Sequence, residues 1–150
     1  FFRMQSYLPA QLVTKSGLVD TAAVLKDKKR VGLYFSAHWC PPCRQFTSML
    51  INFYNELKAA NADDFEIIFV SSDQDEDAFN EYYGEQPWVS VEYGDDSQDS
   101  LAQKFSVRGI PAFYIIDPAT GSIVDADGRG SVMANARNPA QAMAAWSQGK

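Results

Sequence analysis

The chain contains two cysteines, Cys40 and Cys43, and they stand in a single C-x-x-C pattern. A short apolar run at residues 31–35, typical of a buried strand, lies just before them. After them, apolar residues recur every three or four positions as far as Leu57, as on one face of a helix. A disulfide across so short a gap closes almost no loop, so it constrains the unfolded chain very little. We therefore expect the pair to carry chemistry rather than to stabilise the fold.

The position between a strand and a helix supplies what thiol–disulfide exchange requires. The attacking sulfur must be a thiolate, and the unpaired N–H groups and positive dipole end at a helix N-terminus stabilise an anion. Cys40 falls at that position and Cys43 lies one turn further, so we predict an exposed nucleophile at Cys40 and a more buried resolving thiol at Cys43. Pro41 and Pro42 suit the first turn, because proline lacks the N–H that this turn leaves unpaired. Trp39 is expected to shield the site from one side.

A C-x-x-C can also be half of a zinc site, but zinc requires four ligands. The one histidine, His38, lies beside the pair, and the sequence has no second cysteine pair. A strand-to-helix position in an α/β chain favours redox chemistry instead. Cys40 and Cys43 would then act as a redox-active disulfide, with no metal and no organic cofactor.

Composition excludes other classes of function. The net charge is −6, and the sequence has no basic stripe that could neutralise the phosphates of a nucleic acid. No apolar run approaches the ~18 residues that a membrane-spanning helix needs, and no secretory signal is visible. We expect a monomer in the cytoplasm, with the nucleus as a second location. The length predicts one domain over residues 1–150; residues 1–3 are either additions ahead of a native start at Met4 or part of a longer protein.

Apolar runs and helical patterns alternate along the chain, which predicts an α/β fold. The last two strands are separated by turn residues and should form an antiparallel hairpin. Together the elements predict a central mixed sheet with helices on both faces. The expected strands are residues 31–35, 65–70, 112–116 and 122–125. The expected helices are one that begins at Cys40 and carries its apolar face as far as Leu57, and those at residues 73–84, 101–105 and 138–146.

Several local patterns give more specific expectations. Asp73 followed by Glu76 predicts a capping box at the start of the helix at 73–84. Ile110-Pro111 directly precedes a strand, where the peptide bond is either cis or that of an ordinary strand-entry proline. Residues 128–130, Gly-Arg-Gly, are expected to form a turn and do not match a nucleotide-binding fingerprint.

The segment Tyr34-Phe35-Ser36-Ala37-His38-Trp39-Cys40-Pro41-Pro42-Cys43-Arg44 resembles the active-site segment of nucleoredoxins and tryparedoxins, a branch of the thioredoxin superfamily. Further segments also resemble this branch, so the similarity covers nearly the whole chain: residues 7–9, 65–71, 87–88, 109–111 and 128–129. The resemblance implies a thioredoxin fold with a short N-terminal extension. It also implies reduction of disulfide-containing proteins and a supply of electrons from an upstream reductase or a low-molecular-weight dithiol.

The resemblance further implies a cis bond at Pro111, which would lie against the C-x-x-C while its neighbour's backbone pairs with the bound substrate. The implied substrate-binding residues are Trp39, Pro41, Pro42, Ile110, Pro111 and Arg129.

Three departures from related patterns matter. Tyr34 stands where ordinary thioredoxins carry a buried aspartate, which argues against a carboxylate proton relay. Ala112 replaces a common threonine. Ser72 replaces a tryptophan of the tryparedoxins, which weakens the case for a polyamine dithiol such as trypanothione as the reductant.

Two hypotheses follow from these patterns. The first is an enzyme that reduces protein disulfides through Cys40 and Cys43. The alternative is a redox-regulated binding module whose affinity for a partner depends on the state of the Cys40–Cys43 pair.

Overall fold

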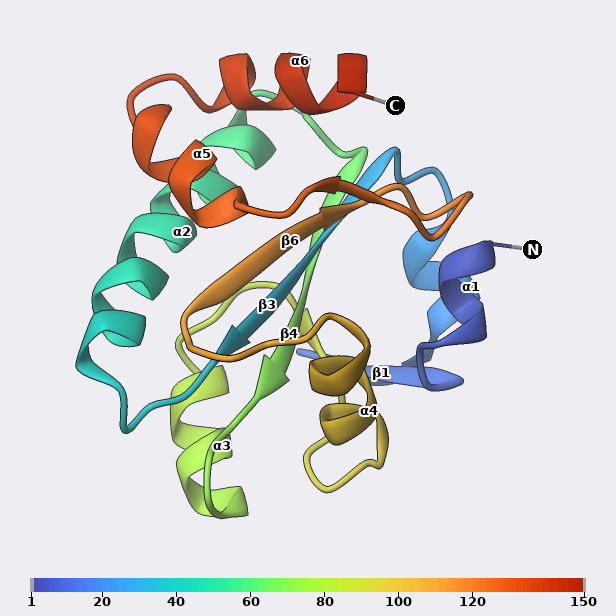
Figure 1. Ribbon diagram of the computed structural model, residues 1–150, viewed down its shortest axis with the longest axis vertical. Coiled ribbons are helices and arrows are strands. Elements are labelled where there is room, and N and C mark those ends of the chain that lie inside the picture. Colours follow the sequence, from blue (N-terminus) through green and yellow to red (C-terminus); the bar gives the residue numbers. More distant parts are fainter. Residues whose placement is uncertain (1, 150) are drawn as a thin grey trace.

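The computed structural model describes residues 2–149 of the chain (Figure 1). Within these residues the strands form one seven-stranded sheet in the order β2-β1-β5-β4-β3-β6-β7. The strands are β1 (Gln11–Thr14), β2 (Gly17–Asp20), β3 (Arg30–Ser36), β4 (Phe65–Ser71), β5 (Val89–Ser90), β6 (Ala112–Ile116) and β7 (Ile123–Asp125). The helices are η1 (Arg3–Ser6), α1 (Thr21–Leu25), α2 (Pro41–Ala59), α3 (Glu76–Tyr83), α4 (Ser97–Lys104), α5 (Gly128–Ala134) and α6 (Pro139–Gly149).

Strand β3 lies at the centre of the sheet and ends next to the cysteines. It pairs in parallel with β4 and antiparallel with β6, and Tyr34 stands between Phe69 and Phe113 in this register. Every residue of β3 is buried, as an apolar run without alternation predicts. The expected strands around the centre and the antiparallel β6–β7 hairpin are confirmed. The sheet is therefore mixed.

Helices cover both faces of the sheet, as predicted. Side chains along a strand point alternately to the two faces, so each face carries apolar residues that helices can bury. Tyr34 and Phe69 point to the face where α2, α3, α5 and α6 bury their apolar residues. Leu33 and Ile68 point to the other face, where η1, α1 and α4 do the same. Figure 1 shows α2, α5 and α6 together on one side of the central strands and α1 on the other.

The N-terminal extension packs onto the β6–β7 hairpin. The backbone N–H groups of Arg3 and Met4 donate to the carbonyls of Ala119 and Pro118, and Met4 is completely buried. Tyr7 donates its hydroxyl to a carbonyl of the same turn, and burial raises the pKa of Tyr7 to about 12. Phe1 lies outside the described residues. None of the described helices is long and apolar enough to cross a membrane.

Three sequence predictions about helix starts were wrong. Helix α3 begins at Glu76, and its cap is Asp75, whose carboxylate accepts a hydrogen bond of 2.8 Å from the N–H of Ala78. Asp73 is not a cap, because its carboxylate is hydrogen-bonded elsewhere. Helix α4 begins at Ser97 rather than at residue 101.

Residues 128–130 were expected to form a separate turn, but they are the first three residues of helix α5. Asp127 caps this helix by accepting a hydrogen bond of 3.0 Å from the N–H of Gly130. A Cβ atom on Gly128 would lie 2.8 Å from the carbonyl oxygen of Phe113. Glycine at this position therefore lets α5 sit directly against β6.

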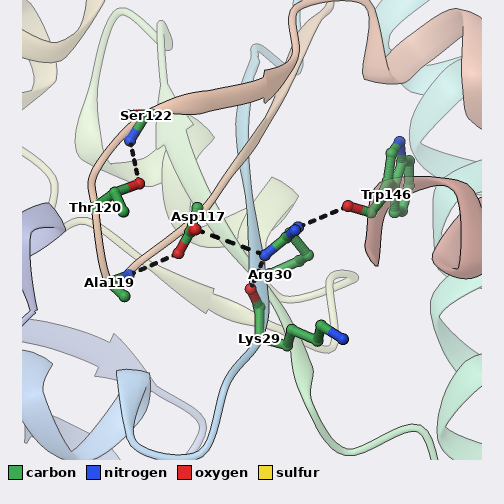
Figure 2. A network of polar contacts seen from close by, with 7 residues as sticks. All are labelled: Lys29, Arg30, Asp117, Ala119, Thr120, Ser122 and Trp146. Carbon is green, nitrogen blue, oxygen red and sulfur yellow. Dashed lines mark hydrogen bonds and ion pairs between the residues drawn. The ribbon is translucent and has the colours of Figure 1, made fainter. Parts of the chain in front are cut away.

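A buried arginine ties together the end of the sheet opposite the cysteines (Figure 2). Arg30, the first residue of β3, is 3% exposed. Its Nε donates to the carbonyl of Trp146 at 2.9 Å and its Nη1 to the carbonyl of Lys29 at 2.7 Å. Its Nη1 also lies 3.9 Å from the carboxylate of Asp117. One side chain thus joins β3, the β6–β7 turn and α6.

Candidate active site

The two cysteines occupy the start of α2, as the sequence predicts. Cys40 is the N-cap residue, and its Sγ accepts a hydrogen bond of 3.3 Å from the N–H of Cys43. The two residues are joined as a disulfide, with Cα atoms 5.2 Å apart. Pro41 and Pro42 are the first two residues of the helix and both are exposed. The first N–H that the helix offers is therefore that of Cys43, and it points at the sulfur of Cys40.

The two sulfurs differ in access. Cys43 is completely buried, whereas Cys40 is 6% exposed. The sequence predicts a more open nucleophile than this. The difference arises because Cys43 covers the Cys40 sulfur on one side and the carbonyl oxygen of Ile110, 3.9 Å away, covers it on another. A disulfide sulfur has no proton to donate, so this second contact is one of packing in the oxidised state. Cys40 remains the sulfur that a substrate can reach first.

A hollow beside Cys40, here named the Cys40 hollow, brings several predicted site residues together. Trp39 is 55% exposed and forms one wall, and its indole N–H donates to the carbonyl of Ser72 at 3.0 Å. Ile110 also lines the hollow, and the Ile110–Pro111 peptide bond is cis. Pro111 itself is buried. The lining residues are Trp39, Cys40, Ser72, Ala102, Val107, Arg108, Gly109 and Ile110.

A second hollow, here named the Arg129 hollow, lies along the next turns of α2. It contains two of the predicted residues, Pro42 and Arg129. The Nε atom of Arg129 is buried and has no hydrogen-bond partner within residues 2–149. The remaining lining residues are Gln45, Phe46, Met49 and Met133. The predicted site residues are thus divided between two hollows, with Trp39, Cys40 and Ile110 in one and Pro42 and Arg129 in the other.

The loop before Cys40 is held by a carboxylate that the sequence analysis assigned to a helix cap. Asp73 is 8% exposed. Its carboxylate accepts hydrogen bonds of 2.7 Å from the backbone N–H of His38 and of 2.7 Å from the hydroxyl of Ser71. Nothing in the local sequence separates this role from capping, because an aspartate before an acidic helix start fits both. The register of β3 against β4 brings Asp73 to the loop.

A chain of buried hydroxyl groups lies beneath the first turns of α2. Hydrogen bonds join Ser36 to Tyr82 at 2.6 Å, Tyr82 to Thr47 at 2.5 Å and Thr47 to Tyr34 at 2.6 Å. The Tyr34 hydroxyl then donates to the carbonyl of Cys43 at 3.3 Å. Each hydroxyl has one proton to give, so donation in this single direction satisfies all four.

The Tyr34 hydroxyl at the end of this series of hydrogen bonds keeps its proton at neutral pH. Burial, and secondarily the neighbouring Tyr82, raise the pKa of Tyr34 far above its ordinary value. Tyr34 therefore supplies a neutral hydrogen bond to the backbone of the buried cysteine where a carboxylate would supply a charge.

Among the residues that the structure describes, no group of three or more His, Cys, Asp or Glu side chains is placed to hold a metal ion. Trp88 is buried in the core at 1% exposure. His38 is partly exposed, with its ring 5.4 Å from that of Tyr82.

Comparisons with known proteins match this geometry. A family model described as Thioredoxin-like matches residues 27–123. The probable nucleoredoxin 1 of Arabidopsis thaliana is 46% identical over 107 residues, which are 71% of this chain and 18% of that protein. The nucleoredoxin of Homo sapiens is 44% identical over 108 residues, which are 71% of this chain and 24% of that protein. The chain therefore spans only about a fifth to a quarter of the length of these curated relatives.

Solved structures match over nearly the full chain. Tryparedoxin from Trypanosoma brucei is 35% identical with a TM-score of 0.82, covering 92% of this chain and 95% of that one. Thioredoxin from Wuchereria bancrofti is 37% identical with a TM-score of 0.78, covering 96% and 98%. A tryparedoxin II complexed with glutathionylspermidine is 27% identical with a TM-score of 0.81, covering 89% and 93%.

Proposed function

The chain belongs to the thioredoxin-like family, in its nucleoredoxin and tryparedoxin branch, and we propose that this thiol–disulfide oxidoreductase reduces protein disulfides, with Cys40 as nucleophile and Cys43 as resolving thiol. The observation that carries the proposal is the difference between the two sulfurs. Cys40 caps the helix and lines a hollow, whereas Cys43 is completely buried behind it.

The reaction proceeds by two exchanges of sulfur partners. In the reduced protein the Cys40 thiolate attacks one sulfur of the target disulfide, so a Cys40–target bond forms while the target's own S–S bond breaks. The Cys43 thiolate then attacks the Cys40 sulfur, which releases the first target cysteine and closes the Cys40–Cys43 disulfide. The target gains two electrons and two protons, and the Cys40–Cys43 pair loses the same number. The cysteines carry out this chemistry without a further cofactor.

The residues around the disulfide suit the binding of an extended protein segment. The Ile110 carbonyl lies beside the Cys40 sulfur, where a substrate backbone N–H can pair with it. Trp39 and Ile110 provide apolar walls on one side of Cys40. Pro41 and Pro42 are exposed at the start of α2, and Pro42 lines the Arg129 hollow together with Arg129.

The oxidised pair must be reduced again by an upstream reductase or a low-molecular-weight dithiol. We propose that this occurs in a reducing compartment, the cytoplasm or also the nucleus, where thiols are kept reduced. Glutathionylspermidine is bound by one related tryparedoxin. Ser72 lines the Cys40 hollow at the place where tryparedoxins carry tryptophan, which favours a reductant other than a polyamine dithiol.

Reduction of insulin by the purified chain tests this proposal. The assay supplies thioredoxin reductase with NADPH, glutathione or trypanothione in parallel, and compares the wild type with Cys40→Ser. We expect turnover with at least one donor and none in the Cys40→Ser variant. If the wild type shows negligible turnover but binds a partner differently in its oxidised and reduced states, the binding-module alternative is correct.

A further inference from the structure

Arg108 is an uncompensated positive charge beside the reactive sulfur. It is exposed, lies two residues before Ile110, and lines the Cys40 hollow together with Cys40 itself. Within residues 2–149 the one ion pair is that of Arg30 with Asp117, so no carboxylate lies within 4.0 Å of the Arg108 guanidinium. The other side chains of the hollow are mainly apolar, with Trp39, Val107 and Ile110 among them.

Arg108 is the one charged residue among those that line the Cys40 hollow. The sequence has 19 acidic residues against 13 lysines and arginines, so a surface arginine has many possible acidic partners. Arg108 has none within 4.0 Å, a feature that it shares with the other described lysines and arginines except Arg30. Arg108 is therefore distinguished by its place beside Cys40 and not by being unpaired.

The Arg108 guanidinium lies close enough to Cys40 to contact side chains next to a target cysteine. During exchange the target sulfur is bonded to Cys40, which lines the same hollow as Arg108. Residues within two positions of the target cysteine lie within about 8 Å of it, because consecutive Cα atoms are 3.8 Å apart. An arginine holds a carboxylate with two parallel hydrogen bonds and remains charged at all relevant pH values.

Building on the proposed function, we propose that Arg108 determines substrate specificity by binding an aspartate or glutamate within two residues of the cysteine that Cys40 attacks. The substrate class is thus a protein disulfide in an acidic segment. The same charge disfavours a lysine at these positions, since a like charge would be brought into a hollow with apolar walls.

Disulfide-cyclised peptides test this inference directly. Three peptides carry Asp, Asn or Lys on both sides of each cysteine and are otherwise identical. For the wild type at low ionic strength we expect kcat/KM to be about tenfold higher for the Asp peptide than for the Lys peptide, with Asn between them. The difference should shrink in about 1 M salt, where the screening length is about 3 Å.

Three variants separate Arg108 from general charge effects. Arg108→Gln should bring the three peptides close together, and Arg108→Glu should reverse their order. Arg3→Glu makes the same change of charge at an exposed arginine next to the β6–β7 turn, at the opposite end of the sheet, and should keep the wild-type order.

An uncharged disulfide, 2-hydroxyethyl disulfide, is the control for the reaction itself. For each variant, kcat/KM for each peptide is divided by kcat/KM for the uncharged disulfide, so that a general change in the reactivity of Cys40 cancels. An order of these ratios that is changed only by the Arg108 substitutions supports the inference. If the uncharged disulfide is reduced but the wild type shows no preference, or Arg3→Glu shifts the order as much as Arg108→Glu, Arg108 does not determine specificity and the reductase proposal stands. If the wild type reduces none of these disulfides, the proposed function falls, and this inference with it.

Discussion

The two ends of strand β3 use arginine in opposite ways. At its first residue, Arg30 is buried and bonded to two carbonyls and a carboxylate (Figure 2). At its other end, beside the cysteines, Arg108 and Arg129 have no acidic partner among the described residues. The buried polar groups there are a chain of hydroxyls and the carboxylate of Asp73, which accepts hydrogen bonds from His38 and Ser71. The first end uses the charge of an arginine to hold the fold. The second leaves the charge of Arg108 exposed to a ligand.

The largest effect on stability is expected from removing the charged side chain of Arg30 at the start of β3. Arg30→Met should lower the free energy of unfolding by about 3 kcal/mol, because it leaves two carbonyls and Asp117 without their partner. Arg108→Met, the same substitution at the other end, should change it by less than about 0.5 kcal/mol. Urea unfolding of the oxidised proteins measures both. Equal losses in the two variants would contradict the distinction between the two ends.

The hydroxyl chain should contribute less, but still measurably. Thr47→Val preserves the shape of the side chain but removes the hydrogen bonds of Thr47 to Tyr34 and Tyr82. We expect the free energy of unfolding to fall by about 2 kcal/mol, because buried hydroxyls are left unsatisfied. Ser48→Ala removes an exposed hydroxyl from the same helix and should cost less than about 0.5 kcal/mol. Urea unfolding again provides the measurement. If Thr47→Val is as stable as the wild type, the hydrogen-bonded hydroxyls do not stabilise the packing of α2.

The smallest effect is expected at Asp125, which binds Trp146, as Arg30 does. Burial alone would raise its pKa, but hydrogen bonds from Ser131, from Trp146 and from the backbone N–H of Asp127 outweigh burial and lower it. The carboxylate thus adds stability above about pH 4, its range in the unfolded chain, and this stability is lost as the pH falls through the lower folded pKa.

Asp125→Asn should remove this part of the acid dependence. The difference from the wild type should be on the order of 0.5 kcal/mol at neutral pH, because solvent reaches the group and screens it. Unfolding of both proteins from pH 7 down to pH 3 tests it. Parallel stability curves over this range would show that Asp125 does not titrate in the way described.

Sequence patterns predicted the parts of this molecule that depend on local order. The apolar runs gave the central strands, and Cys40 with its two prolines gave the start of α2, because capping and strand burial are encoded within a few residues. Strand β5 was not predicted, since two residues carry no periodicity. The role of Asp73 was missed because it depends on how β3 and β4 lie side by side. The hydroxyl chain likewise joins Ser36, Thr47 and Tyr82 from three separate elements.

Capture of targets by the Cys43→Ser variant tests the central claim most directly. Serine preserves the helix but cannot attack the Cys40 sulfur, and the chain has no third cysteine, so the bond between Cys40 and a target should persist. Reduced Cys43→Ser is incubated with insulin or with a cell extract, and the products are separated on gels with and without reductant. We predict adducts that disappear on reduction and that are absent from the Cys40→Ser/Cys43→Ser double variant. Adducts that survive in the double variant, or none in Cys43→Ser under conditions where the wild type reduces insulin, would contradict the assignment of Cys40 as nucleophile and Cys43 as resolving thiol.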